Sequence, residues 1–259
     1  MDAQAHGLKI LPACVNESDW RCTVTRNGAV QLGLCLVAGL TEARARELLH
    51  ARGKGPFATL EELRERTRLP QTDLRTLSSI GALRTLSRHR REALWRIEEP
   101  LHEQDLFARP ANTPAPATPL APMSPVERLE SDFAGTGLTT GPHAMALCRP
   151  NLPEAWTAAE LRTAPHGTHL QAAGMVISRQ RPGTAKGFVF LSLEDETGVA
   201  NVVLTPALFE KVRLTVSQEA FLVIEGVVQQ QEGVTHLKAQ RVSALNASAL
   251  PSPSSHDFH

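Results

Sequence analysis

Cysteine is scarce in this 259-residue chain, and its few cysteines have no metal-binding or disulfide spacing. Cys14, Cys22, Cys35 and Cys148 form no CxxC pair, which argues against a structural zinc site and fits a reducing cytosol. No apolar run approaches the roughly 18 residues that cross a bilayer, and the first ten residues lack the pattern of a signal peptide. We therefore expect a cytoplasmic protein with no membrane partner.

Net charge is also lacking, because 27 Lys and Arg residues balance 27 Asp and Glu residues. A neutral total gives a nucleic-acid binder no overall attraction, so the charge of each region matters more than the sum. Hydrophobic residues make up 42% and charged residues 21% of the chain, which is typical of a folded protein. The length suits one large domain or two small ones.

A proline-rich segment divides the chain. Prolines recur between alanines and threonines in residues 108–125, a pattern that cannot continue a helix and favours an extended linker. The expected organisation is a remnant of a preceding region in 1–32, a helical module in 33–107, the linker in 108–125, a helical and loop connector in 126–167, a β-barrel in 168–245 and a flexible tail in 246–259.

Helix signals are dense before the linker. Thr41 is placed to cap a helix that ends at Gly53, and Thr59 with Glu62 forms a capping-box pattern for a helix that stops at Pro70. A third helix is expected over residues 71–79. A fourth is expected to be capped by Ser87 and to pack inward through Leu94, Trp95 and Ile97.

Five β-rich runs follow the linker, and a helix-compatible stretch lies between the third and the fourth. The runs are 169–181, 187–196, 199–204, 221–230 and 235–245, and the helical stretch is 205–212. Glu232 and Gly233 predict a hairpin turn between the last two strands. This is the element order of an OB-fold barrel. The fold class is therefore α+β, with a helical helix-hairpin-helix module, a Pro-rich linker and a five-stranded OB barrel.

The segment before the first helix could hold DNA. Gly39 allows a tight turn, and Leu40 and Thr41 lead into a helix whose first backbone N–H groups can bind a phosphate, as in a helix-hairpin-helix motif. A weaker copy surrounds Gly81. An ordinary helix connection that contains glycine explains the pattern equally well.

Local charge favours the DNA interpretation. Residues 33–97 contain 13 Lys and Arg but 7 Asp and Glu, an excess of six positive charges. The DNA-binding candidates of this module are Gly39, Leu40, Thr41, Arg44, Arg52, Lys54, Gly81, Arg88, Arg90 and Arg91.

The second barrel strand could stack bases. Val189, Leu191 and Leu193 share one parity and suit the barrel interior, which leaves Phe188 and Phe190 on the other face, where OB domains stack single-stranded bases. Alternatively, one Phe packs under the linker or a neighbouring domain. The candidates on this side are Arg179, Arg181, Lys186, Phe188, Phe190, His236, Lys238 and Arg241, joined by Gln229 and Gln230. Residues 168–245 hold 7 basic and 7 acidic side chains, so we expect modest binding.

Candidates for catalysis are weak. Glu194, Asp195 and Glu196 are adjacent on a predicted strand end, so neighbouring side chains point to opposite faces and cannot converge on a metal pair about 4 Å wide. His166 and His169 have no further ligands near them in sequence, and no nucleophile elbow or phosphate loop is found. We expect no catalytic residue, metal or cofactor in this chain.

Several longer strings resemble one family. They are LPACVNESDW, QLGLCLVAGL, PFATLEEL, LSSIGAL, RREALW, TGLTTGPHAMALCRPNL, VISRQRPGTAKGFVFLSLEDETGVANVVL and the terminal HDFH. Together with the order of modules, they resemble the C-terminal part of bacterial C-family DNA polymerases, closest to the error-prone, damage-inducible branch. The resemblance covers nearly the whole chain, with His143-Ala144 where relatives commonly have His-Pro.

The resemblance implies a region that contacts duplex and single-stranded DNA in a polymerase that extends DNA past lesions. It also implies accessory mutagenesis proteins as partners and, indirectly, the sliding clamp. The chain contains no Asp-x-Asp, so the family's polymerising palm, with its Mg²⁺, is expected only in the parent and this chain is expected to be inactive alone. A different class of function, a protein-interaction module that docks accessory proteins, remains open because the fold does not determine the function.

Overall fold

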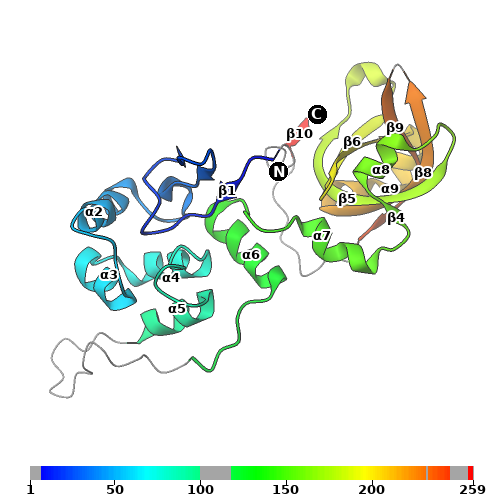
Figure 1. The fold of residues 1–259 in the computed structure, drawn as a ribbon. Coiled ribbons are helices and arrows are strands. Elements are labelled where there is room, and N and C mark those ends of the chain that lie inside the picture. Colours follow the sequence, from blue (N-terminus) through cyan, green and yellow to red (C-terminus); the bar gives the residue numbers. More distant parts are fainter. Residues whose placement is uncertain (1–6, 100–117, 232, 246–255, 259) are drawn as a thin grey trace. The chain divides into compact units, whose positions relative to one another are not determined.

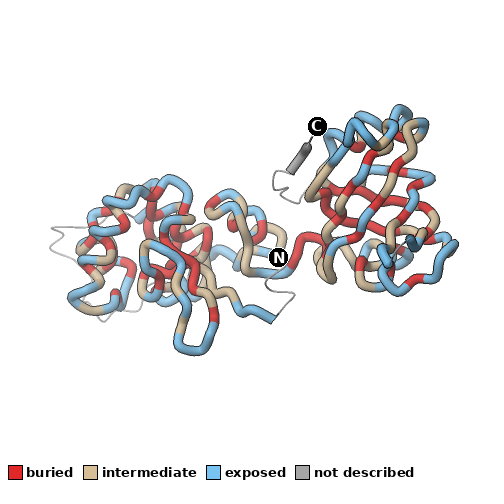
Figure 2. The backbone as a smooth tube through the Cα atoms, turned by 90° about the horizontal axis from the view of Figure 1, so that it is seen from above, coloured by how far each residue is buried: buried red, intermediate tan, exposed pale blue. Residues whose placement is uncertain are grey.

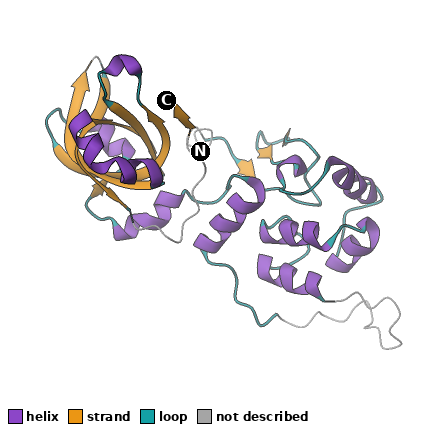
Figure 3. Cartoon of the chain, turned by 180° about the vertical axis from the view of Figure 1, so that it is seen from behind, coloured by secondary structure: helices purple, strands orange, loops and turns teal. Residues whose placement is uncertain are grey.

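The computed structural model of the protein describes residues 7–99, 118–231, 233–245 and 256–258 (Figure 1). These residues form two compact units that divide between Thr140 and Gly141. Helices dominate one unit and strands the other, as the colours of Figure 3 show. The predicted α+β class, with a helical module before a five-stranded barrel, is confirmed. In the described part of the chain, no helix is long and apolar enough to cross a membrane.

The helical unit begins with a small sheet and continues through helices. Its elements are β1 (Ile10–Leu11), β2 (Thr23–Val24), β3 (Val30–Gln31), the 3-10 turn η1 (Leu34–Leu36), α2 (Glu42–Arg52), α3 (Leu60–Thr67), α4 (Gln71–Ser79), α5 (Arg90–Glu98) and α6 (Pro125–Thr136). β1 and β2 both pair with β3. Ala13 and Val15 are buried in the same core as the helices, so the described part of the segment expected as a remnant, residues 7–32, packs within this unit.

Local capping explains most helix starts. The Thr41 hydroxyl accepts from the Arg44 N–H at 3.4 Å, and Thr59 accepts from Glu62 N–H at 3.1 Å. α5 differs from the expectation. Its cap is His89, whose Nδ1 accepts from the Glu92 N–H at 3.1 Å.

Two side chains near α5 also differ from the expectation. Ser87 hydrogen-bonds back to the Leu83 carbonyl at 3.2 Å and so does not cap the helix. Trp95 is 44% exposed and does not pack inward, whereas Ile97 is fully buried. The helical period places Ile97 on the buried face and leaves Trp95, two residues away, on the solvent side.

α6 follows the Pro-rich stretch but packs on the helical unit. Its Gly135 carbonyl accepts from the Ala38 N–H at 2.8 Å. A Cβ at Gly135 would lie 2.2 Å from Ile80 Cγ2, so only glycine allows the helix this close. The boundary between the two units thus falls after α6, and not at the Pro-rich stretch, part of which lies outside the described residues.

The barrel unit holds the remaining described elements. They are α7 (Ala144–Cys148), the 3-10 turn η2 (Arg149–Asn151), β4 (Ala155–Trp156), α8 (Ala158–Thr163), β5 (His169–Gln180), the 3-10 turn η3 (Gly183–Ala185), β6 (Val189–Asp195), β7 (Gly198–Leu204), α9 (Pro206–Gln218), β8 (Phe221–Gln231), β9 (Val234–Ala244) and β10 (His256–Phe258). α9 lies between the third and fourth barrel strands, as predicted.

The barrel closes because β5 pairs on both sides. Its first half pairs with β8 and its second half with β6. β6 pairs with β7, the parallel pair β7–β9 follows, and β9 returns to β8. Closure removes the open sheet edges that invite aggregation. Gln231 pairs with Val234 across the predicted hairpin, and Gly233 has a left-handed φ of 78°; Glu232 lies outside the described residues.

Side chains alternate between the barrel core and the surface, and Figure 2 shows the buried and exposed stretches along the strands. Val189, Leu191 and Leu193 are each at most 3% exposed, so the predicted inward parity of β6 is confirmed. β10 was expected to be part of a flexible tail. It pairs with Ser178–Gln180 of β5, where that strand extends beyond its last partner on β8.

Candidate nucleic-acid interfaces

The first glycine turn has the geometry that a backbone phosphate site needs. Gly39 has a φ of +79°, and the space where its Cβ would be is open. Leu40 is buried beneath the turn, while Gly39 and Thr41 are exposed. α2 starts directly afterwards, and the first N–H groups of a helix have no acceptor within it. These groups and the helix dipole together favour an anion at this end of α2.

The second glycine turn is built differently. Gly81 has a φ of +76° and its N–H donates to the Ser78 carbonyl at 3.0 Å, but turns follow it and the next helix, α5, starts only at Arg90. The Arg90 guanidinium covers the turn, because a Cβ at Gly81 would lie 2.8 Å from its Nε. The Gly81 turn is therefore covered by a side chain. The Gly39 turn, in contrast, is followed directly by the N–H groups of a helix start.

Several of the predicted DNA-binding arginines have internal partners. Arg44 pairs with the buried Asp73 at 3.2 Å. Arg52 donates to the carbonyls of Val15 and Ser18 at 3.2 and 2.6 Å and pairs with Asp19. These contacts fasten α2 to other parts of its own unit.

The two arginines at the start of α5 likewise bind α6 and the residues before it. Arg90 pairs with Asp132 at 2.8 Å and donates to the Ser79 carbonyl at 3.0 Å. Arg91 pairs with Glu127 at 2.5 Å and donates to the Ala121 carbonyl at 3.2 Å. The positive charge of these arginines is thus partly neutralised by carboxylates.

Other basic side chains of the unit are available to a ligand. Lys54 and Arg88 are exposed, and neither side chain has an internal partner among the described residues. Lys54 lines a groove on the outer side of α2 together with His50 and Arg68. Arg68, the C-cap of α3 with a left-handed φ of 50°, was not among the predicted DNA-binding residues.

Two cross-strand rows form the outer face of the barrel. Residue pairing places Phe190, Val203 and Lys238 side by side across β6, β7 and β9. The neighbouring row consists of Ser192, Asn201, His236 and Gln229 on β6, β7, β9 and β8. The predicted Phe190, His236 and Lys238 thus share one face, and Asn201, which the sequence analysis did not select, lies between them.

Phe190 is the exposed aromatic of this face. It is 38% exposed, which is unusual for an aromatic side chain on a central strand, whereas Phe188 is half-buried before β6. The Lys238 ammonium is exposed and has no internal partner among the described residues. Lys238 lies two strands from Phe190, with Val203 between them. An exposed aromatic ring and a free cation on one face are the pattern that stacks a base and attracts its phosphate.

The basic loop between β5 and β6 is only partly free. Arg179 donates to the carbonyls of Val216 and Glu219 at 2.6 and 2.8 Å and so joins β5 to α9. Arg181 lies over the Phe209 ring, 5.2 Å from its centroid.

Lys186 in the same loop is exposed with a left-handed φ of 50°. On β9, Arg241 faces Glu225 of β8 at 3.9 Å. Gln229 is half-buried and Gln230 exposed, with the Gln230 amide donating to the Ala164 carbonyl at 3.0 Å.

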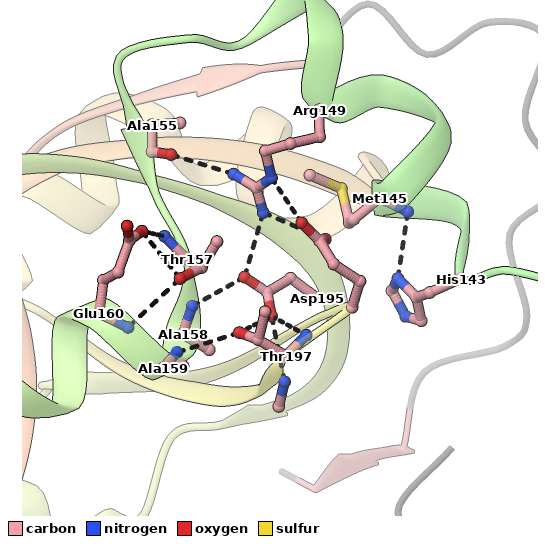
Figure 4. Close-up of polar contacts among 12 residues, drawn as sticks. His143, Met145, Arg149, Ala155, Thr157, Ala158, Ala159, Glu160, Asp195 and Thr197 are labelled. Atoms are coloured by element: carbon pink, nitrogen blue, oxygen red, sulfur yellow. Dashed lines mark hydrogen bonds and ion pairs between the residues drawn. The ribbon is translucent and has the colours of Figure 1, made fainter. Parts of the chain in front are cut away.

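The adjacent carboxylates at the end of β6 and in the turn that follows bind groups of the segment before the barrel (Figure 4). Asp195 is almost fully buried and accepts from the N–H groups of Ala158 and Thr197, both at 2.7 Å. Arg149 spans Asp195 and Glu196 at 3.1 and 2.6 Å. These bonds join the segment before the barrel to the β6–β7 turn. Across the described residues, no group of three potential ligands is placed to hold a metal ion.

Glu194, the third carboxylate, faces a buried histidine. His143 caps α7 through its Nδ1, which accepts from the Met145 N–H at 3.1 Å, and its Nε2 lies 3.7 Å from Glu194 Oε2. The neighbouring His143 holds the pKa of the Glu194 carboxyl below its usual value, and burial acts in the opposite direction. The departure from His-Pro at position 144 leaves this cap intact.

Two family profiles match the chain, one in each unit. Residues 7–93 match the helix-hairpin-helix motif, and residues 171–245 match the OB-fold nucleic acid binding domain. The fold and both matches define a nucleic-acid-binding region and support a DNA-binding role.

The chain is similar to several curated polymerases over nearly all of its own length. The chain is 41% identical over 252 residues to an error-prone DNA polymerase of Alkalilimnicola ehrlichii and 41% identical over 255 residues to that of Bordetella parapertussis. It is 37% identical over 266 residues to error-prone DNA polymerase 2 of Rhizobium meliloti. These alignments cover 93–95% of the chain but 24% of each relative. The chain is thus similar to bacterial error-prone DNA polymerases and spans about a quarter of the length of these relatives.

Proposed function

We propose that this chain is the DNA-gripping region of an error-prone DNA polymerase that acts in damage-induced, translesion synthesis. The helical unit binds duplex DNA at the Gly39 turn, and the barrel binds single-stranded template on its outer face. Nucleotide addition and its Mg²⁺ belong to the palm of the parent polymerase. The observation that carries the proposal is the outer-face row in which exposed Phe190 and unpaired Lys238 lie on either side of Val203.

The outer face favours single strands for physical reasons. A base that stacks on Phe190 contributes roughly 1–3 kcal/mol, and Lys238 adds an electrostatic contact to the backbone. Asn201 and His236 on the adjacent row offer hydrogen bonds to the edges of bases that are already unstacked. The barrel region as a whole has no net charge, so stacking contributes more than long-range attraction.

A second function has its own support. The internal pairing of Arg44, Arg52, Arg90 and Arg91 reduces the charge available to DNA, and Trp95 leaves an aromatic surface exposed. Such a unit could dock accessory mutagenesis proteins, through which the parent reaches the sliding clamp. Binding to those proteins in the absence of DNA, by a chain that does not bind DNA, would support this alternative.

Fluorescence anisotropy of the 259-residue chain with labelled single-stranded and duplex DNA, over a salt series, tests the main proposal. We expect binding to both that weakens as salt rises, because counterions are released from the phosphates. Phe190→Ala is expected to weaken single-strand binding by about tenfold, within the range for loss of one stacked base, and to leave duplex binding unchanged.

The matched control is Leu214→Ala, which removes an even more exposed apolar side chain from α9, on the same unit. Its DNA affinities should equal those of the parent chain. Absence of DNA binding by the folded chain at low salt contradicts the proposal, and equal single-strand affinity of Phe190→Ala contradicts the assignment of the outer face.

A further inference from the structure

A pocket opens beside the second glycine turn of the helical unit. It has a volume of about 210 Å³ and is lined by residues of the α4–α5 connection and by Arg128 and Met123, which flank the start of α6. Gly81 forms part of its wall, and the guanidinium of Arg90 lies against that glycine. Pro12 completes the lining, so three segments of the sequence form the pocket, and the Pro-rich stretch separates the α4–α5 connection from the start of α6.

The lining carries one sign of charge. It includes four arginines and one histidine, and it includes no carboxylate; the basic residues are Arg84, Arg88, His89, Arg90 and Arg128. Arginine presents several N–H donors in a planar fork that matches phosphate oxygens. A pocket with this lining binds an anion in preference to a neutral or cationic ligand.

Two of the arginines form a rigid frame. Arg84 is held by the carbonyls of Pro12 and Ala13 and pairs with Glu17. Arg90 is held by the Ser79 carbonyl and by Asp132. Because these contacts fix both guanidinium groups before any ligand arrives, binding loses little side-chain entropy at these positions.

The other basic groups are free to meet a ligand. The Arg88 side chain has no internal partner among the described residues. Arg128 donates through Nε to the Met123 carbonyl at 3.1 Å, which orients the guanidinium and leaves its terminal nitrogens available. His89 uses Nδ1 to cap α5, so its Nε2 can serve as a donor.

We infer that this pocket binds a phosphate group. Its volume is below the roughly 300–1,000 Å³ of pockets that enclose drug-sized ligands, so it suits one phosphate with part of a sugar. Arg88 and Arg128 contact the phosphate oxygens, while Arg84 and Arg90, whose charges Glu17 and Asp132 partly offset, form the fixed wall of the pocket. When the phosphate belongs to a DNA backbone, the inference rests on the proposed function; a free phosphate compound is the second source.

Two substitutions test the site in the full 259-residue chain. Arg88→Gln with Arg128→Gln removes both exposed charges and leaves the frame intact, and Arg26→Gln, at an exposed arginine outside the pocket, is the matched control. Duplex binding over a salt series is measured by anisotropy. Inorganic phosphate and pyrophosphate are titrated while the NMR signals of the arginine side chains and of His89 are followed.

With a backbone phosphate in the pocket, the double variant binds duplex more weakly, and the slope of log affinity against log salt becomes about one unit less steep. Arg26→Gln keeps the parent slope. Unchanged duplex binding by the double variant, together with shifts on adding phosphate or pyrophosphate, assigns the pocket to a free phosphate compound.

Failure of the inference and failure of the proposed function are distinguishable. The phosphate assignment of the pocket is wrong if the parent chain and the double variant bind duplex equally and phosphate causes no NMR shifts. The proposed function then still stands, because the chain binds duplex. A folded chain that binds no DNA overturns the proposed function; phosphate-induced shifts then support the pocket, and their absence overturns it as well.

Discussion

The two units use charged residues in opposite ways. The helical unit is rich in arginine, yet Arg44, Arg52, Arg90 and Arg91 pair with carboxylates of the same unit. The barrel region is neutral, yet Lys238 on its outer face is unpaired among the described residues and lies in the same row as an exposed aromatic ring. An excess of charge in a sequence therefore does not measure the charge that a ligand meets.

This difference reflects how each unit is stabilised. Helices meet along narrow stripes, and long arginine side chains bridge the gaps between α4, α5 and α6. A closed barrel satisfies its backbone groups through strand pairing, so its outer face needs fewer such bridges. The barrel concentrates its buried charges in one place, around Asp195.

The largest expected effect is at that buried carboxylate. Asp195→Ala leaves the N–H groups of Ala158 and Thr197 without their acceptor and removes one partner of Arg149, so we expect the barrel unit to lose about 3–5 kcal/mol. The loss of unfolding free energy is measured by urea unfolding, with hydrogen exchange at the amides of β6 as the readout for the barrel unit. Glu154→Ala, at an exposed carboxylate of the same unit, is the control and should change little.

Arg90→Ala tests whether an arginine of the helical unit is structural. It removes the cationic partner of the buried Asp132, which keeps the Thr139 hydroxyl as a hydrogen-bond donor, and it uncovers the Gly81 turn. We therefore expect the helical unit to lose about 3 kcal/mol of stability. Urea unfolding of the unit, with Arg26→Ala as control, is the measurement. A variant as stable as the parent chain, but weaker in duplex binding, would mean that Arg90 contributes to binding alone.

Gly39→Val tests the first turn. Its φ of +79° costs a residue with a Cβ about 1–2 kcal/mol, although the space around that Cβ is open. We expect weaker duplex binding and unchanged single-strand binding in the anisotropy assay. Gly39→Asn, which tolerates the left-handed region, should retain most of the duplex affinity. Equal loss in both variants would point to a need for the bare backbone at this turn.

The smallest expected effect concerns pH. The folded-state pKa of Glu194 is lowered, so its charged form stabilises the barrel above the unfolded-state pKa, and this contribution is lost as pH falls through the folded pKa. Glu194→Gln should therefore be less stable than the parent chain at neutral pH, and the difference should shrink below about pH 4. Thermal unfolding over that pH range checks the sign. A difference that does not depend on pH would assign the effect to packing.

Local rules predicted the elements well. The start of α2 follows from a threonine and the N–H groups a few residues later, and the inward parity of β6 follows from alternation along one strand. Both depend on neighbours in sequence. The DNA contacts predicted for the glycines and basic residues of both units stay predictions.

Long-range partners could not be predicted in the same way. Arg90 and Asp132 are separated by the Pro-rich stretch, and no local pattern says that α6 returns to pack beside α5. The outer-face role of Asn201 likewise depends on the register between β7 and β9, which the sequence of one strand does not reveal. Tertiary context decided each of these features.

The position of α6 changes what the Pro-rich stretch means for the chain. Glu99 and Thr118, the described residues on either side of this stretch, both belong to the helical unit, as do α5 and α6. Loop-closure entropy grows slowly, and doubling the length of a flexible loop costs only about 0.6 kcal/mol. Insertions and deletions in this stretch should therefore be nearly neutral for stability, and they do not lengthen the connection between the helical unit and the barrel.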